Sequence, residues 1–170
     1  MIRTAILFCL LLSALTLQAQ EYKNSAGFRF CKTDGLTYKR FLTTNGAIET
    51  MLGFGGYDGG MQAYVNYQWY QPVPSTYTGY LHFYYGVGGH TGYIRPTRTV
   101  DYYEGDQIVS ETQQYTDYVI GVDGILGVEY RIFTVPMTVG MDIKPFFEYY
   151  ALQYTRFRFW DFGFTVKYIF

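Results

Sequence analysis

The sequence predicts an all-β protein, a closed eight-stranded antiparallel up-and-down β-barrel that crosses a membrane and follows an N-terminal signal peptide. Three observations support this prediction. The first residues have the features of an export signal. The remainder alternates between apolar and polar residues with the two-residue period of a β-strand. Aromatic residues make up 21% of the chain and charged residues only 16%, whereas charged residues average about 25% in soluble domains.

The overall composition limits the class of function. A chain of 170 residues has the length of one domain. Its formal net charge of −1 excludes a nucleic-acid binder that relies on a basic surface. Its hydrophobic content of 49% excludes intrinsic disorder.

The N-terminal segment is the first element, and it predicts export. Arg3 provides a positive charge, residues 5–17 form an apolar stretch, and Ala19 is a small residue suited to signal peptidase. The alternative, an N-terminal membrane anchor, is disfavoured because a spanning helix needs about 20 apolar residues. We therefore expect residues 1–19 to be a signal peptide and residues 20–170 to form an outer-membrane barrel domain.

The mature chain contains no further apolar run of helix length. A chain of this kind can enter a membrane only as a closed barrel, because lipid tolerates no unpaired sheet edge. The turn signals Asp34-Gly35, Asn45-Gly46 and Asp58-Gly59-Gly60 divide its first half, and prolines at 72, 74 and 136 mark later turns. The expected strands are about 25–33, 36–43, 47–57, 60–71, 78–95, 117–133, 136–152 and 156–170.

Alternation within these segments supports the strand assignments. The segments 61–69, 118–133 and 137–151 each place apolar side chains on one face and polar or small ones on the other. The last segment is the clearest. Its apolar face carries Trp160, Phe162, Phe164, Val166, Tyr168 and Phe170.

The sizes of the side chains indicate which face points into the barrel. One face carries large rings in nearly every strand, and the other carries charges interspersed with glycine. Because side chains only just fill an eight-stranded bore, we expect the charged face inside and the aromatic face against lipid. The alternative is a soluble secreted lipocalin-like barrel that binds a ligand, with its apolar face inside.

The expected lumen carries five basic and six acidic side chains. Buried charges have to be paired, so a nearly balanced set indicates structural cross-bracing of a plugged lumen and not a catalytic carboxylate pair. The predicted polar network comprises Arg29, Lys39, Glu49, Asp123, Glu129, Arg131, Asp142, Lys144, Glu148, Asp161 and Lys167.

Four internal segments carry a family resemblance: Gly27-Phe28-Arg29-Phe30, Gly35-Leu36-Thr37-Tyr38-Lys39-Arg40-Phe41-Leu42, Gly121-Val122-Asp123-Gly124-Ile125-Leu126-Gly127-Val128-Glu129-Tyr130 and Asp142-Ile143-Lys144-Pro145. In them the chain resembles small eight-stranded outer-membrane β-barrel proteins of the OmpA/OmpX type, and most nearly the short barrel proteins of Bacteroidota. The alternate positions of Phe164, Val166, Tyr168 and Phe170 resemble the C-terminal signal that the barrel-assembly machinery reads in that family. The resemblance implies the outer membrane of a Gram-negative bacterium, with lipid and the assembly machinery as partners, and no catalytic chemistry.

Residue types that support catalysis or metal binding are few and scattered. His82 and His90 share a face, but the extended strand between them spans roughly 26 Å, so they are not expected to chelate one metal. Cys31 is the single thiol expected in the mature chain. We expect no catalytic residue, cofactor or metal. The enzymatic alternative, a lipid-modifying acyltransferase-like enzyme, would have to draw on Ser75, Ser110 and His82.

The longest connection, residues 96–116, is a candidate site of surface contacts, and the alternative is a solvated, variable loop with no partner. Outer-membrane barrels have short periplasmic turns and longer loops outside. With periplasmic termini, the turns near 44–46, 71–77 and 133–135 are periplasmic, and those near 34–35, 58–60, 96–116 and 152–156 are outside. The strands that flank 96–116 exceed the roughly ten residues that lipid requires, so a ribbon is expected above the membrane. Its candidate contact residues for an extracellular partner are Tyr102, Tyr103 and Tyr115.

Overall fold

The computed structural model of the chain describes residues 22–55, 59–73, 80–104, 107–151 and 155–170. For residues 98, 100–104, 107–109 and 111 it describes the backbone alone. The predicted signal peptide and Ser75 lie outside the described residues. No helix among the described residues is long and apolar enough to span a membrane.

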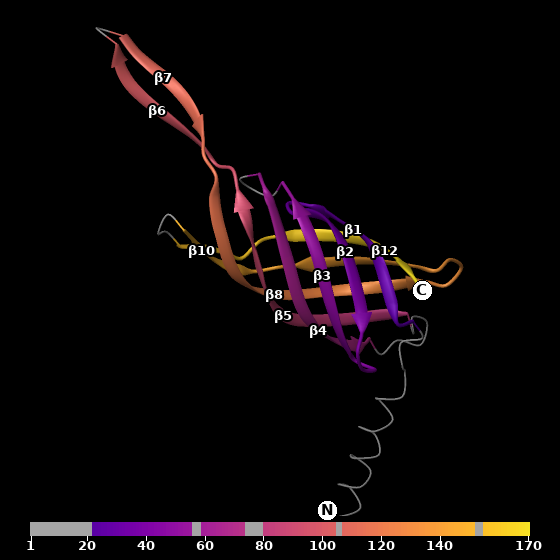
Figure 1. Cartoon of the computed structure of the whole chain (residues 1–170). Helices are drawn as coiled ribbons and strands as arrows, with labels where there is room; N and C mark the ends of the chain where they lie inside the picture. The colour runs from indigo at the N-terminus through magenta and orange to yellow at the C-terminus, as the bar shows by residue number, and fades with distance from the viewer. Residues whose placement is uncertain (1–21, 56–58, 74–79, 105–106, 152–154) are drawn as a thin grey trace, which may run out of the picture.

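Eight strands form one closed antiparallel sheet (Figure 1). In order around the barrel they are β1 (Asn24–Cys31), β2 (Asp34–Phe41), β3 (Gly46–Phe54), β4 (Met61–Pro72), β5 (Leu81–Ile94), β8 (Asp117–Ile132), β9 (Met137–Ile143) and β12 (Phe162–Ile169). The sheet closes because β12 pairs with β1. The predicted fold, a closed eight-stranded antiparallel barrel, is therefore confirmed.

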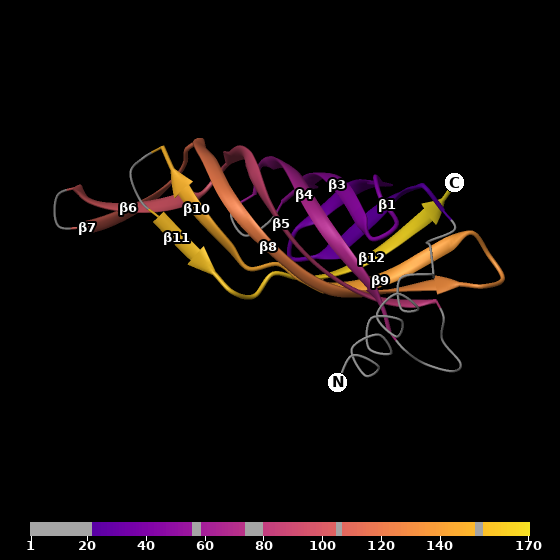
Figure 2. The ribbon, with the colours of Figure 1, turned by 90° about the horizontal axis from the view of Figure 1, so that it is seen from below.

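Two hairpins extend the barrel at the end away from the C-terminus. β10 (Phe146–Tyr150) pairs with β8 and with β11 (Thr155–Arg158), so this hairpin prolongs the wall. β6 (Thr97–Glu104) and β7 (Gln107–Gln114) form a separate two-stranded sheet. Figures 1 and 2 show both hairpins at the same end, with β6–β7 projecting furthest.

Strand tilt makes the barrel wall uneven in height. Starting from Phe28, successive Cα partners are Leu36, Leu52, Ala63, Thr91, Ile120, Tyr149 and Thr155. Phe28 itself pairs with Val166 across the closing seam, so one circuit advances 166 − 155 = 11 residues along the last strand. Closed barrels need such a stagger, and here it raises the ends of β5, β8, β10 and β11 above those of β1–β4.

The two faces of the sheet differ as the alternation predicts. In β2 the burial of side chains alternates strictly, with Thr37 and Lys39 buried and Leu36 and Tyr38 exposed. The same division holds in β12, where Thr165 and Lys167 point inward. Large apolar side chains of the outer face include Phe28, Phe30, Tyr85, Leu126, Phe162 and Phe164.

The first turn differs from the prediction. Asp34-Gly35, expected as a turn, begins β2, and the turn lies at residues 32–33. The Asp34 carboxylate nevertheless acts on the turn, because its Oδ1 accepts a hydrogen bond from the Cys31 amide at 2.8 Å. Asp side chains stabilise turns through such bonds to nearby backbone. The sequence therefore indicated a turn correctly, but placed it two residues too late.

The last two expected strands are each interrupted once. Residues 136–152 divide into β9 and β10 around Pro145, which has no amide hydrogen for the sheet; its carbonyl still accepts from the Gly124 amide at 2.8 Å. Residues 156–170 divide into β11 and β12 at residues 159–161, where this strand contains one residue more than β9–β10 opposite. An extra residue of this kind is a β-bulge, and it bends the strand.

Candidate functional site

The interior of the barrel holds a large set of buried charged residues. Ten of the eleven residues expected in the lumen are buried: Arg29, Lys39, Glu49, Asp123, Glu129, Asp142, Lys144, Glu148, Asp161 and Lys167. The eleventh, Arg131, is half-buried near the end of β8. Asp117 and His90 are also buried, although neither was assigned to the network. Apart from Asp117, these buried charges fall into three clusters along the barrel.

The terminal cluster joins Lys39, Glu49, Glu129 and Lys167 near the end of the barrel that carries the C-terminus. Lys39 Nζ contacts the Glu129 carboxylate and donates to the Tyr70 hydroxyl at 2.8 Å. Lys167 Nζ lies 2.5 Å from Glu49 Oε1 and 3.7 Å from Glu129 Oε2. The two carboxylates also accept hydrogen bonds from Tyr22, Thr37 and Gln68. Each buried charge therefore has an opposite charge beside it, as burial requires.

The central cluster is organised by Arg29. Its Nη2 lies 2.7 Å from Asp142 Oδ1, and its Nη1 lies 3.4 Å from Asp161 Oδ2. Thr33 Oγ1 donates a further hydrogen bond to Asp161 Oδ2 at 3.0 Å. Lys144 Nζ lies 3.7 Å from Asp161 Oδ2 and 3.5 Å from the centre of the Tyr64 ring. These contacts join the first strand to the last two across the seam where the sheet closes.

The hairpin-end cluster is built on His90. Its Nδ1 lies 2.9 Å from Asp123 Oδ1, and its Nε2 lies 3.2 Å from Glu148 Oε1. The Tyr150 hydroxyl donates to the same Glu148 side chain. A histidine that activates a nucleophile has a serine or cysteine hydrogen-bonded to it. Here the imidazole lies between two carboxylates, and among the described residues no serine or cysteine is hydrogen-bonded to His90. The geometry is that of a bracing contact between β5, β8 and β10.

Aromatic rings also fill the interior. Tyr70 and Tyr84 are fully buried and stack with their ring centroids 5.1 Å apart. The space for Tyr84 is provided by Gly127, where an added Cβ would lie 2.6 Å from Tyr84 Cζ. Sequence reasoning used large rings to identify the outer face and did not place these rings inside. The available signal was parity within each strand, because Tyr70 shares the face of Gln68 in β4 and Tyr84 shares the face of His90 in β5.

The side chains considered for catalysis do not come together. His82 lies near the start of β5, and Ser110 lies in β7 of the projecting hairpin beyond the other end of that strand. Cys31 is an exposed free thiol on the rim. Among the described residues, no group of three or more His, Cys, Asp or Glu side chains is placed to hold a metal ion.

The expected surface segment is a ribbon of two strands. Tyr102 and Tyr103 lie in β6, where their backbones pair with Val109 and Ile108, and Tyr115 follows β7 and is half-buried. Apart from β6 and β7 themselves, no described strand pairs with this ribbon. The backbone N–H and C=O groups along its two long edges therefore take no part in pairing with another described strand.

The proposed C-terminal signal lies on the outer face of β12 and just beyond it. Phe164, Tyr168 and Phe170 are exposed, and Val166 is half-buried between them. The rings of Tyr168 and Phe170 stack at 6.3 Å. These side chains continue the apolar outer surface to the end of the chain.

No family model matches the chain, and no curated protein matches it. Among solved structures, the crystal structure of the N-terminal β-barrel domain of Pseudomonas aeruginosa OprF is similar to this chain. The two superpose with a TM-score of 0.48 and 17% sequence identity, over 90% of this chain and 100% of that one. At this identity the similarity concerns the fold alone.

Proposed function

We propose that this protein is an integral outer-membrane β-barrel with a plugged polar lumen and a non-enzymatic structural or surface-interaction role. One observation carries the proposal: the chain buries its charges and exposes its large apolar side chains. Phe28, Ile120 and Phe164 are each at least half exposed, whereas Lys39, Lys167 and Asp161 are at most 1% exposed.

The energetics of this inverted arrangement favour lipid around the barrel. Full burial of one large apolar side chain is worth roughly 1.5–3 kcal/mol, so a water-exposed face of this composition would be costly. Soluble monomers rarely expose contiguous apolar patches beyond a few hundred Å². A soluble ligand-binding barrel would place the apolar face inside, where this chain has Lys39, Glu129 and Arg29. The lipocalin-like alternative is therefore disfavoured.

The orientation follows from the two ends of the barrel. The start of β1 and the end of β12 lie together, opposite the β6–β7 hairpin (Figure 1). We place the terminal end in the periplasm and the hairpin outside the cell of a Gram-negative bacterium, after removal of residues 1–19 as a signal peptide. The alternate apolar residues that end at Phe170 would then serve assembly of the barrel into the membrane.

The role we favour is contact with an extracellular partner through β6–β7. A ribbon with free backbone edges offers sites for strand addition by another chain. Among the described residues an acyltransferase-like activity has no support in the geometry, because His82 lies near the start of β5 and Ser110 lies in the hairpin beyond the other end of that strand.

Membrane extraction tests the proposal. Membranes washed with urea or carbonate should retain the protein, and unheated protein should migrate differently from boiled protein on a detergent gel. Both results are expected because the barrel is embedded through its outer face and closed by hydrogen bonds. Recovery of the folded protein in the soluble periplasmic fraction would contradict the proposal and favour a soluble barrel.

A further inference from the structure

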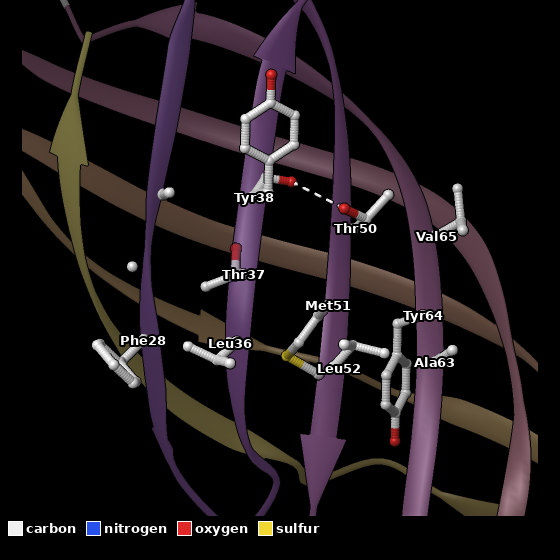
Figure 3. Close-up of a pocket in the computed structure, with 12 residues that line it drawn as sticks. Phe28, Leu36, Thr37, Tyr38, Thr50, Met51, Leu52, Ala63, Tyr64 and Val65 are labelled. Atoms are coloured by element: carbon white, nitrogen blue, oxygen red, sulfur yellow. Dashed lines mark hydrogen bonds between the residues drawn. The ribbon is translucent and has the colours of Figure 1, made fainter.

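The outer wall formed by β1–β4 contains an apolar groove of about 630 Å³ (Figure 3). Small side chains at Ala26, Thr50 and Ala63 leave this space, and Phe28, Leu36 and Leu52 line it. The pairing register brings these residues together, because Ala63 pairs with Leu52, and Leu36 pairs with both Leu52 and Phe28. The groove extends across β1–β4 on the shorter wall of the barrel, and each strand contributes three consecutive residues to it.

One end of the groove is polar. The Tyr38 ring lines the groove and turns towards the terminal end of the barrel, where its hydroxyl donates to Asn24 Oδ1 at 3.0 Å. Asn24 is the Cα partner of Arg40, which follows Tyr38 by two residues on the same outward face. Lys23, also exposed, precedes Asn24. The outward-facing Arg40 therefore lies just beyond the Tyr38 side of the groove, and the exposed Lys23 is close to it along the chain.

Within the described part of the chain, no counter-charge lies beside Arg40. It is exposed on the outer face, and among the described residues it takes part in no ion pair. The charges of the three interior clusters, by contrast, each have an opposite charge nearby. A guanidinium on the outside of a membrane barrel is tolerated near the rim, where it can reach the head groups. Phosphate is the anion available there, and guanidinium binds phosphate through paired hydrogen bonds.

We propose that the groove binds one anionic phospholipid of the periplasmic leaflet. An acyl chain lies along Ala26, Thr50 and Ala63, and the phosphate is held by Arg40 with Lys23 beside it. The apolar part of the groove corresponds to the acyl chain, which lies deeper in the leaflet. The cationic side corresponds to the phosphate, which lies at the membrane surface. This inference rests on the proposed membrane location.

Lipid retention tests the head-group contact. Full-length protein is reconstituted into nanodiscs that contain equal amounts of phosphatidylglycerol and phosphatidylcholine, and the retained lipids are counted by native mass spectrometry. We expect one retained lipid, with about a fivefold preference for phosphatidylglycerol, which corresponds to the roughly 1 kcal/mol that one basic residue contributes at an anionic membrane surface. Arg40→Gln should abolish the preference, and Lys32→Gln, which removes an exposed charge at the other rim, should keep it.

Filling the groove tests the acyl-chain contact. Val65 and Val87 are similarly exposed on the outer face, at 55% and 59%, but only Val65 lines the groove. We expect Val65→Trp to reduce retention of the lipid and Val87→Trp to leave it at the parent level. Equal retention in the two variants, or an unchanged lipid preference in Arg40→Gln, would overturn the inference.

The outcomes separate this inference from the membrane proposal. If the parent protein fails to enter the nanodiscs and does not float with vesicles, the membrane location itself is wrong. If it inserts and shows heat-modifiable migration, but retains no anionic lipid, the membrane location stands and the lipid site is wrong.

Discussion

Arg29 joins two carboxylates that come from the far end of the chain. Its side chain is 4% exposed and lies between Asp142 and Asp161, which are as deeply buried. Loss of one partner from a buried pair is costly because the other charge is left in a medium of low polarity. Arg29 therefore stabilises the closing seam, because its charge and those of the two carboxylates are buried away from water.

We expect Arg29→Met to lower the free energy of unfolding by about 3–5 kcal/mol, because two carboxylates lose their main counter-charge. Urea unfolding of the protein in lipid vesicles measures the change. Arg131→Met is the matched control, and its half-buried side chain should cost less than about 1 kcal/mol. The double variant Arg29→Met/Asp142→Asn should recover part of the loss. If Arg29→Met and Arg131→Met are equally stable, water must reach the Arg29 site and solvate the two carboxylates, which would contradict their burial.

Parity along each strand predicted which residues lie inside, but not which of them meet. Arg29 and Asp142 are 113 residues apart, and Lys39 and Glu129 are 90 apart. Their contact depends on the stagger that accumulates around the closed sheet, which no single strand encodes. Parity therefore placed ten residues that are buried, but it did not reveal the three clusters.

At the scale of the element, the segment between β5 and β8 was the largest omission. It was expected as a connection with a ribbon, and most of it forms β6 and β7. The sequence of these two strands lacks the alternation that identified the others, and the ribbon pairs with no other described strand. The breaks at Pro145 and at residues 159–161 were missed for a different reason, since alternation continues on both sides of each break.

Deletion of residues 98–114 should leave a folded, heat-modifiable barrel. Residues 95–97 and 115–116 would then join Ile94 to Asp117, whose Cα atoms already pair in the sheet. Gel migration with and without heating measures folding, and capture of an extracellular partner measures function. A variant that no longer folds would show that the hairpin supports the barrel, and one that still captures the partner would show that contact occurs elsewhere.

At the scale of the whole molecule, we propose that the interior is plugged by its own side chains. The three charged clusters and the stacked rings of Tyr70 and Tyr84 occupy successive levels of the bore. Eight strands enclose a space that side chains only just fill, so little room remains for water along the axis. The sequence predicted both the number of strands and the charged interior, but the interior rings and the uneven wall arise from packing and tilt.

Planar-bilayer recordings should therefore show no stable, ion-selective channel. The expected trace is a baseline with at most brief, irregular events, because the clusters have to separate before ions can pass. Reproducible conductance from the single folded species would contradict a plugged lumen.

The central claim is that the outer face meets lipid, and the two tryptophans of the chain report on it directly. Trp69 and Trp160 both point outward, with 37% and 62% of their surface exposed. In vesicles, we expect their fluorescence to be quenched by phospholipids with brominated acyl chains and little affected by aqueous iodide. Single-tryptophan variants, Trp69→Phe and Trp160→Phe, assign the signal to each side of the barrel. Strong quenching by iodide, with no effect of brominated lipid on either variant, would show that this face meets water and would contradict the account.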